Sequence, residues 1–307
     1  MFQLKRGVWP TMITPYRADG EIDFNAIEAM VEWYAKNGCA GIFAVCASSE
    51  MFKLSLAERV ALARSVVYAA RGKIGVIASG HVSDSIEAQI EELTLIAQTG
   101  PEAVVLVCNR LARQGEGDDV WIKNGQRILD AMPGIMFGVY ECPGPYPRLM
   151  TPKTIAWCAE TGRFAFLKDT CCSTPQMAEK LKYMKDTPFA LYNANSATAL
   201  ETLRLGARGF SGVMANFHPD LYAWLCANFE RYPKEAELLA GFLSLASGVE
   251  RQCYPVSAKH HMQLEGIPIR LDCRTRDAEA YSYAARLEVE QLRALEKYVR
   301  AELGITP

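Results

Sequence analysis

The feature that most constrains the fold is a regular alternation of short apolar runs and helical segments. Apolar runs typical of buried parallel strands occur eight times, at residues 7–13, 41–45, 74–78, 103–107, 135–140, 164–168, 190–192 and 209–213. The segments between them carry helix signals. Eight strand–helix units predict an α/β fold, a (β/α)8 TIM barrel.

Several of the intervening segments begin with a recognisable helix start. Asp23 precedes residues 24–36, whose apolar side chains recur on one face. Ser55 and Glu58 have the spacing of a capping box, in which each side chain bonds the other residue's free amide. Ser173 indicates a further N-cap before a proline. These signals place helices between the strands.

The last quarter of the chain has helical patterns without intervening strands. Its amphipathic segments are residues 235–249 and 277–303, and the stretch 254–272 between them is punctuated by Pro and Gly as a connection would be. We therefore predict a catalytic barrel domain over residues 1–229 and a helical extension over residues 230–307 that packs on the barrel.

Composition and charge exclude several classes of function. The formal net charge of −2 leaves no basic surface for nucleic acid or an acidic membrane. No apolar stretch approaches the ~18 residues that span a bilayer, and the first residues lack the apolar core of a signal peptide. We expect a cytoplasmic protein with neither nucleic acid nor membrane as a partner. The charged run 270–276 is predicted to be a solvated loop.

Two polar residues end neighbouring apolar runs. Lys168 closes the run at 164–168, and Tyr140 closes the preceding run at 135–140, one strand–helix unit earlier. Burial disfavours an ammonium ion and so lowers a lysine pKa, which makes the amine a candidate Schiff-base nucleophile. A phenol beside the imine can shuttle protons. The alternatives are a solvated lysine at a strand end and a half-buried core tyrosine.

The ten cysteines show no Cys-x-x-Cys pair and no spacing typical of zinc modules, so we expect reduced, mostly buried thiols and no metal. An alternative stays open because four thiols and one imidazole fall near predicted strand ends, where they are potential soft metal ligands. These residues are Cys46, Cys108, Cys142, Cys171 and His81.

Taken in order, these motifs resemble the dihydrodipicolinate synthase / N-acetylneuraminate lyase family of class I aldolase-type enzymes, from about residue 7 to about residue 270. The matching elements are Thr14-Pro15, Cys46-Ala47-Ser48-Ser49-Glu50, Tyr140 with Pro143-Gly144, Lys168-Asp169, Gly209-Phe210-Ser211-Gly212, and Tyr254-Pro255 with Lys259. The resemblance implies a lyase that forms a Schiff base with a 2-oxo acid through Lys168, with Tyr140 moving protons. It also implies a homotetramer or homodimer, and this chemistry needs no cofactor.

Further polar residues are expected at the carboxyl ends of strands, where barrel enzymes place their chemistry. The hydroxyls and amides around Ala47, Ser48 and Ser49 are candidates for holding the substrate carboxylate, or else they simply cap a turn. The remaining substrate-binding candidates are Arg110, Asn195 and Ser211.

Departures from the family pattern argue against its two best-known substrates. The synthases' relay hydroxyl, partner-subunit tyrosine and carboxylate-binding arginine align with Ala47, Leu111 and Pro145, although Arg148 follows closely. The sialic acid lyases' sugar-binding carboxylates align with Asn195 and Ser196, which carry no carboxylate. We expect pyruvate-type aldol cleavage, condensation or dehydration of another 2-oxo acid. The alternatives are a true dihydrodipicolinate synthase and a non-catalytic or regulatory barrel that binds small carboxylates.

Overall fold

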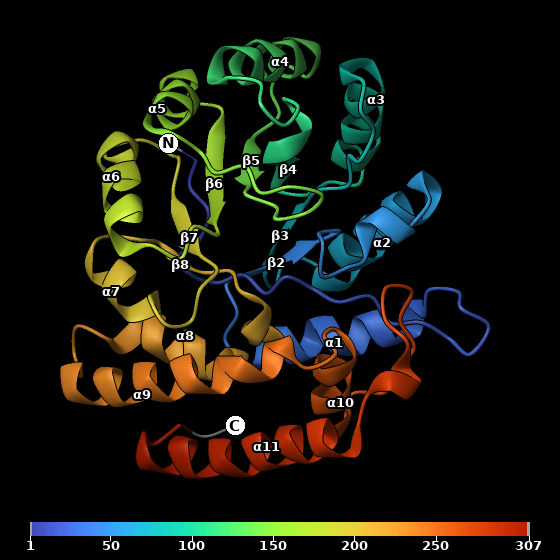
Figure 1. Cartoon of the computed structure of the whole chain (residues 1–307), viewed down its shortest axis with the longest axis vertical. Coiled ribbons are helices and arrows are strands. Elements are labelled where there is room, and N and C mark those ends of the chain that lie inside the picture. Colours follow the sequence, from blue (N-terminus) through green and yellow to red (C-terminus); the bar gives the residue numbers. More distant parts are fainter. Residues whose placement is uncertain (1, 306–307) are drawn as a thin grey trace.

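Eight parallel strands form the centre of the structure, a computed structural model that describes residues 2–305 (Figure 1). The strands are β1 Gly7–Val8, β2 Gly41–Ala44, β3 Gly75–Ala78, β4 Ala103–Val107, β5 Phe137–Tyr140, β6 Phe164–Asp169, β7 Leu191–Asn193 and β8 Gly209–Phe210. They pair in the order β1-β8-β7-β6-β5-β4-β3-β2, and a parallel bridge between Thr11 and Phe43 joins the two ends. The predicted TIM barrel is therefore confirmed.

A ring of helices surrounds these strands (Figure 1). The helices are α1 Phe24–Lys36, α2 Leu56–Ala70, α3 Ile86–Ala97, α4 Asp118–Ala131, α5 Pro152–Thr161, α6 Thr174–Met184, α7 Ala199–Arg204 and α8 Pro219–Asn228. Among the described residues, no helix has the length and apolarity required to cross a membrane.

Local helix signals are confirmed at three starts, but the side-chain cap forms at only two of them. The Asp23 carboxylate accepts hydrogen bonds from the first free amides of α1. Ser55 and Glu58 form the expected capping box of α2. Ser173 precedes α6 as predicted, but its side chain makes no capping hydrogen bond. Pro175 near the start of α6 preorganises the first turn, so the helix begins there without that bond.

The first and last strands are shorter than the runs 7–13 and 209–213 that were predicted. Pro10 has no N–H, and beyond Val8 the chain makes only separate hydrogen bonds, such as Met12 N to Phe43 O at 3.0 Å. The two strands also approach closely where the barrel closes. A Cβ atom at Gly209 would lie 1.8 Å from the Gly7 carbonyl oxygen, so only glycine fits there.

Aromatic side chains fill the barrel interior. The ring of Phe166 stacks on Tyr192, with centroids 4.7 Å apart, and it meets Phe43 and Trp9 at 5.8 and 6.3 Å. The edge of Tyr140 packs against Phe43 at 5.6 Å. Such packing leaves no continuous pore, so a ligand can approach Tyr140 only from the carboxyl end of the strands.

The C-terminal extension contains three helices, α9 Pro233–Ala246, α10 Val256–Leu264 and α11 Tyr283–Glu302. In Figure 1, α9 lies beside α8, and α11 lies outermost, next to α9 and α10. The predicted helix 235–249 ends early and continues as a 3-10 turn, η4 (Ser247–Arg251). Residues 254–272 were predicted to be an irregular connection, and this was wrong because they contain α10. The predicted helix 277–303 begins only at Tyr283. The division into two domains stays a prediction.

The charged run 270–276 was predicted to be a solvated loop, but in the structure it is docked on the rest of the protein. The guanidinium of Arg274 binds the Glu58 carboxylate at 2.6 Å and the Gly20 carbonyl at 2.9 Å. The backbone amides of Arg274 and Thr275 donate to the buried Glu50 carboxylate. These contacts tie the extension to the loop that follows β2.

A buried polar cluster fixes α11 against the rest of the protein. The Glu296 carboxylate accepts from His218 Nδ1 at 2.8 Å, from His261 Nε2 at 3.2 Å and from Arg300 at 3.2 Å. Burial alone would raise the Glu296 pKa, but the two imidazoles outweigh it and hold that pKa well below its usual range. These contacts favour one packing arrangement, although His218 Nε2 and His261 Nδ1 have no hydrogen-bond partner among the described residues.

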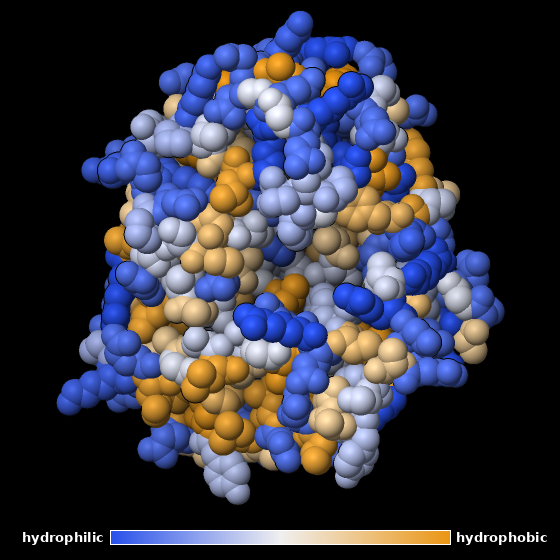
Figure 2. Space-filling view, viewed as in Figure 1, coloured by the Kyte–Doolittle hydropathy of each residue, from blue (hydrophilic) through white to orange (hydrophobic). Residues whose placement is uncertain are grey.

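Figure 2 shows the molecular surface in the same orientation as Figure 1. The surface is hollowed near the centre of this view, and apolar side chains gather over the C-terminal extension. An apolar groove between α9 and α11 is lined by Leu238, Leu245 and Tyr298, all well exposed. Exposed apolar patches often mark contact surfaces.

Candidate active site

Lys168 lies near the carboxyl end of β6 and is buried, with 3% of its surface exposed. Its Nζ atom lies over the Tyr140 ring, 4.7 Å from the centroid, and makes no hydrogen bond or ion pair within residues 2–305. Burial lowers the pKa of Lys168 to about 8, an effect that nearby Cys46, Cys142 and Glu250 partly oppose. The amine therefore reaches its neutral, nucleophilic form near physiological pH.

Tyr140 is directly paired with Lys168 in the β5–β6 register and is 4% exposed. Burial raises the pKa of its phenol well above the usual value, and the neighbouring thiols of Cys142 and Cys46 add to this. At neutral pH the phenol is protonated and is a hydrogen-bond donor. A cation formed at the lysine nitrogen would favour the phenolate and help the proton leave.

The loop after β2 is backbone-strained and offers two free amides. Val45 has a φ of 52°, an unusual value for a β-branched residue, and Glu50 has a φ of 60°. Such strain often occurs at functional sites. The amides of Ser49, Glu50 and Met51 bond carbonyls within the loop, whereas those of Ala47 and Ser48 have no acceptor among the described residues. Two adjacent free amides form an anion-binding concavity.

The two serine hydroxyls of this loop have different surroundings. Ser49 Oγ donates to Met12 O at 2.6 Å and accepts from the Cys46 amide at 3.0 Å, so it holds the loop together. Ser48 Oγ is 3.2 Å from Thr11 Oγ1. Of the two, the Ser48 hydroxyl is the one with room for another partner.

The other three candidates each make contacts of their own within the protein. Arg110 pairs with Asp84 at 3.0 Å and lines a separate cavity of about 160 Å³. Asn195 Oδ1 accepts from the amide and hydroxyl of Thr198, both at 3.1 Å. Ser211 Oγ is fully buried and donates to the Trp9 carbonyl at 2.8 Å. Their roles in substrate binding stay predictions, and the hydroxyl of Ser211 is already used.

Arg148 does not replace the arginine that the synthases place at the position of Pro145. Its guanidinium donates to the Glu116 carbonyl at 2.9 Å and lies 3.4 Å from the Asp118 carboxylate. Both contacts hold it at the start of α4. The Arg148 guanidinium is therefore already engaged.

Sequence reasoning missed an ionic cluster beside the two central residues. Lys180 on α6 binds Glu141 Oε1 at 2.6 Å and Asp169 Oδ2 at 2.5 Å, and all three side chains are almost completely buried. Glu141 follows Tyr140 in the chain, and Asp169 follows Lys168. The cluster therefore ties the ends of β5 and β6 together. Burial, then repulsion from Asp169, raises the pKa of Glu141 to about 7.

Sequence reasoning also gave no role to Tyr254, although it belongs to a quoted motif. Its hydroxyl accepts from Asn216 Nδ2 at 3.2 Å, and the same Nδ2 donates to the Thr11 carbonyl at 2.9 Å. Burial raises the pKa of this phenol well above its usual value, and Ser48 and Thr11 partly oppose the shift. Tyr254 therefore brings the C-terminal extension to the loop that carries Ser48.

The possible metal ligands are not assembled. Within residues 2–305 no three His, Cys, Asp or Glu side chains form a metal-binding group. Both His81 nitrogens are engaged, Nδ1 with Gln89 at 2.9 Å and Nε2 with the Val107 amide at 2.6 Å. Burial lowers the pKa of His81 to about 4.

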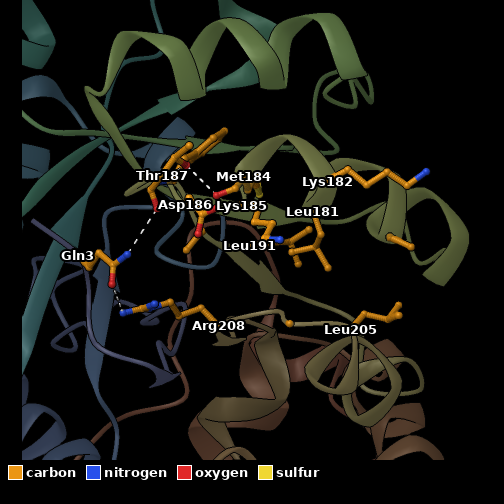
Figure 3. Close-up of a pocket in the computed structure, with 14 residues that line it drawn as sticks. Gln3, Leu181, Lys182, Met184, Lys185, Asp186, Thr187, Leu191, Leu205 and Arg208 are labelled. Atoms are coloured by element: carbon orange, nitrogen blue, oxygen red, sulfur yellow. Dashed lines mark hydrogen bonds between the residues drawn. The ribbon is translucent and has the colours of Figure 1, made fainter. Parts of the chain in front are cut away.

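A larger cavity of about 480 Å³ lies elsewhere (Figure 3). It is lined by Gln3, Leu191 and Arg208, and Gln3 bonds Arg208 at 2.8 Å. These residues precede or begin β1, β7 and β8, so the cavity lies at the amino ends of the strands. Because barrel chemistry takes place at the opposite end, this cavity is not the candidate active site.

The fold and the site together define a (β/α)8 barrel that carries a buried lysine beside a tyrosine at the carboxyl ends of adjacent strands. The chain belongs to the dihydrodipicolinate synthetase family, whose model matches residues 4–291. This is a family of lyases that form a Schiff base with pyruvate. The resemblance inferred from the sequence motifs is thus confirmed.

Individual relatives are distant. The chain is 26% identical over 270 residues to the 4-hydroxy-tetrahydrodipicolinate synthase of Teredinibacter turnerae, covering 86% of each protein. It is 29% identical over 225 residues to that of Acidithiobacillus ferrooxidans, covering 72% of this chain and 74% of the relative.

Solved structures share the fold at lower identity. The dihydrodipicolinate synthase DapA-2 of Bacillus anthracis superimposes with a TM-score of 0.85 at 22% identity, covering 95% of this chain and 98% of that one. YagE, a prophage protein of E. coli K12 solved in complex with pyruvate, has a TM-score of 0.83 at 19% identity, with 96% and 98% covered. These likenesses support the architecture.

Proposed function

We propose that the protein is a lyase that forms a Schiff base between Lys168 and a 2-oxo acid. The observation that carries the proposal is the Lys168 amine, buried, unpaired among the described residues, 4.7 Å from the Tyr140 ring and with its pKa lowered to about 8. A structural lysine in such a place would normally have an ionic or hydrogen-bonding partner, as Lys180 does.

The substrate carboxylate binds the free amides of Ala47 and Ser48, with the Ser48 hydroxyl beside it. This contact holds the substrate ketone at the amine, so that the addition becomes effectively unimolecular. Ala47 then binds the carboxylate through its backbone amide. A residue without a side-chain hydroxyl can therefore serve in carboxylate binding at this position.

The neutral Lys168 amine attacks the ketone carbon, and Tyr140 donates the proton with which the former ketone oxygen leaves as water. The resulting cationic imine accepts the electron pair of the breaking C3–C4 bond and becomes an enamine, while the C4 hydroxyl gives its proton to the Tyr140 phenolate and the C4 fragment leaves as an aldehyde. Protonation of the enamine carbon and hydrolysis return the amine. For dehydration, loss of a C3 proton gives the enamine, which then expels a hydroxyl group from C4.

Reductive trapping tests this function. With pyruvate and cyanoborohydride, the protein should gain one covalent adduct, located at Lys168 by mass spectrometry. The Lys168→Arg variant keeps a cation but has no competent nucleophile, so it should gain none. An adduct that persists in Lys168→Arg, or the lack of an adduct in the wild type, contradicts the proposal.

Dihydrodipicolinate synthase activity is a second candidate because the relatives of 26% and 29% identity carry that name. The residues at the site oppose it, since Pro145 replaces the carboxylate-binding arginine and Arg148 is bound elsewhere. We also propose a homo-oligomer, a dimer or tetramer, on family resemblance, and light scattering of the purified chain tests it.

A further inference from the structure

One ionisable side chain of the C-terminal extension lies at the barrel mouth without a partner. Glu250 belongs to η4, is partly buried, and makes no hydrogen bond or ion pair within residues 2–305. A partly buried carboxylate normally has a hydrogen-bonding or ionic partner. Glu250 therefore has free acceptor oxygens for a ligand.

The electrostatic neighbours of Glu250 agree with the packing of the segment that carries it. Burial is the main cause of the shifted pKa values of Lys168, Tyr222 and Tyr254, and Glu250 contributes to each of them. It contributes likewise to the raised pKa of Cys172. These four residues lie on β6, on the loop after it, on α8 and in the extension, which agrees with a position of Glu250 at the barrel mouth.

A hydrogen bond and the packing of two turns hold the segment that carries Glu250 at the carboxyl ends of the strands. The Tyr254 hydroxyl, four residues further on, is bonded by Asn216 at 3.2 Å. The η4 turn packs against η3 (Val213–Asn216), the segment that follows β8. On the α8 side, the Tyr222 hydroxyl bonds Ser196 at 2.6 Å and is therefore already partnered.

We propose that Glu250 is a specificity-determining residue that contacts the part of the substrate beyond C3, accepts hydrogen bonds from its hydroxyl groups and excludes a second carboxylate there. The proposal rests on the proposed function, because Lys168 and the amides of Ala47 and Ser48 fix the other end of the substrate. The substrate class is a hydroxylated 2-oxo acid whose distal end is uncharged.

Charge and hydrogen bonding both support this class. A carboxylate accepts but does not donate hydrogen bonds, so hydroxyl groups suit it. Like charges placed close together in a partly buried site cost several kcal/mol, which makes Glu250 a repulsive element against an anionic distal group. The arginine that would attract such a group is absent at Pro145.

Two probes that differ only at C6 test the proposal. 2-Oxo-3-deoxygluconate ends in a CH₂OH group, and 2-oxo-3-deoxyglucarate ends in a carboxylate. The half-saturating concentration for cyanoborohydride trapping at Lys168 is measured for each probe and for pyruvate, which has no atoms beyond C3. The variants are Glu250→Gln and, as a matched control, Glu288→Gln, an exposed glutamate on α11.

The wild type and Glu288→Gln should be half-saturated by the C6 alcohol at a concentration at least tenfold lower than by the C6 carboxylate. In Glu250→Gln this ratio should shrink at least tenfold, because the repulsion is gone, while pyruvate is still trapped. An unchanged ratio, or equal losses for all three acids, overturns the role of Glu250 and leaves the proposed function standing. No trapping of any acid by the wild type overturns the proposed function, and this inference with it.

Discussion

Replacing Lys180 with methionine should destabilise the protein strongly, although the change lies outside the candidate active site. The Lys180 ammonium contacts Glu141 at 2.6 Å and Asp169 at 2.5 Å, and both carboxylates are inaccessible to solvent. Methionine has a similar length and fills the same space, so the loss of charge dominates. The variant leaves two buried carboxylates facing each other without a cation.

The magnitude follows from that burial. Removing one partner of a buried ion pair costs about 3–5 kcal/mol, and two carboxylates lose their partner here. Lys182, two residues further along α6, provides the control. It pairs with Glu179 while 69% of its side chain is exposed, and exposed pairs contribute about 0–1 kcal/mol. Lys182→Met should therefore change the free energy of unfolding by less than about 1 kcal/mol.

The dependence on pH provides a second signature. Burial and the charge of Asp169 already raise the pKa of Glu141 from 4.5 to about 7 while Lys180 opposes the shift, so loss of the ammonium raises the pKa of Glu141 further. An acid with a raised folded pKa destabilises the fold as the pH rises past the unfolded value. Lys180→Met should thus be less destabilised at pH 5 than at pH 8.

Urea unfolding at both pH values, followed by circular dichroism, measures these differences. A loss below about 1 kcal/mol for Lys180→Met at pH 8, or a loss equal to that of Lys182→Met, would refute the reasoning. A larger loss at pH 5 than at pH 8 would refute the assignment of charges in the cluster.

Three further predictions concern the chemistry. With a Lys168 pKa of about 8, the rate of imine formation with pyruvate should rise with pH and level off above about pH 8, because the neutral amine is then the main form; stopped-flow measurements that rise steadily to pH 10 would contradict this. Tyr140→Phe should lower turnover of the true substrate by ~10²–10⁴-fold with unchanged circular dichroism, and near wild-type turnover would assign the proton transfer to another group. Condensation of pyruvate with aspartate semialdehyde, coupled to a dihydrodipicolinate reductase, should be feeble, because a missing charge-assisted contact costs on the order of 2–4 kcal/mol; kcat/KM of about 10⁴ M⁻¹s⁻¹ or more would identify a synthase.

The sequence alone predicted the barrel because the signals involved are local. A strand buried on both faces must be apolar along its whole length, and a helix start needs a capping side chain such as Asp23 or Ser55 within a few residues. The pairing of Tyr140 with Lys168 also followed from the sequence, since consecutive units of a barrel lie side by side. The sequence alone therefore identifies these two residues as neighbours.

Only the tertiary structure decided which polar groups are free. Ser211 and Ser48 look equivalent as hydroxyls after strands, yet the first donates to the Trp9 carbonyl and the second lies beside two unbonded amides. The same holds for Lys180 and Lys182, alike in sequence and opposite in burial. A hydrogen-bond partner more than a hundred residues away leaves no mark in a local pattern.

The role of the extension likewise came from the tertiary structure. Glu250 lies in a stretch with no motif, far along the chain from Lys168, and reaches the barrel mouth only because α11 is fixed by the buried Glu296 cluster and Tyr254 is bonded to Asn216. Apolar periodicity predicts that a helix packs, but not where. The position of a carboxylate so distant in sequence from Lys168 depends on how whole helices pack against the barrel, and that packing exists only in the folded chain.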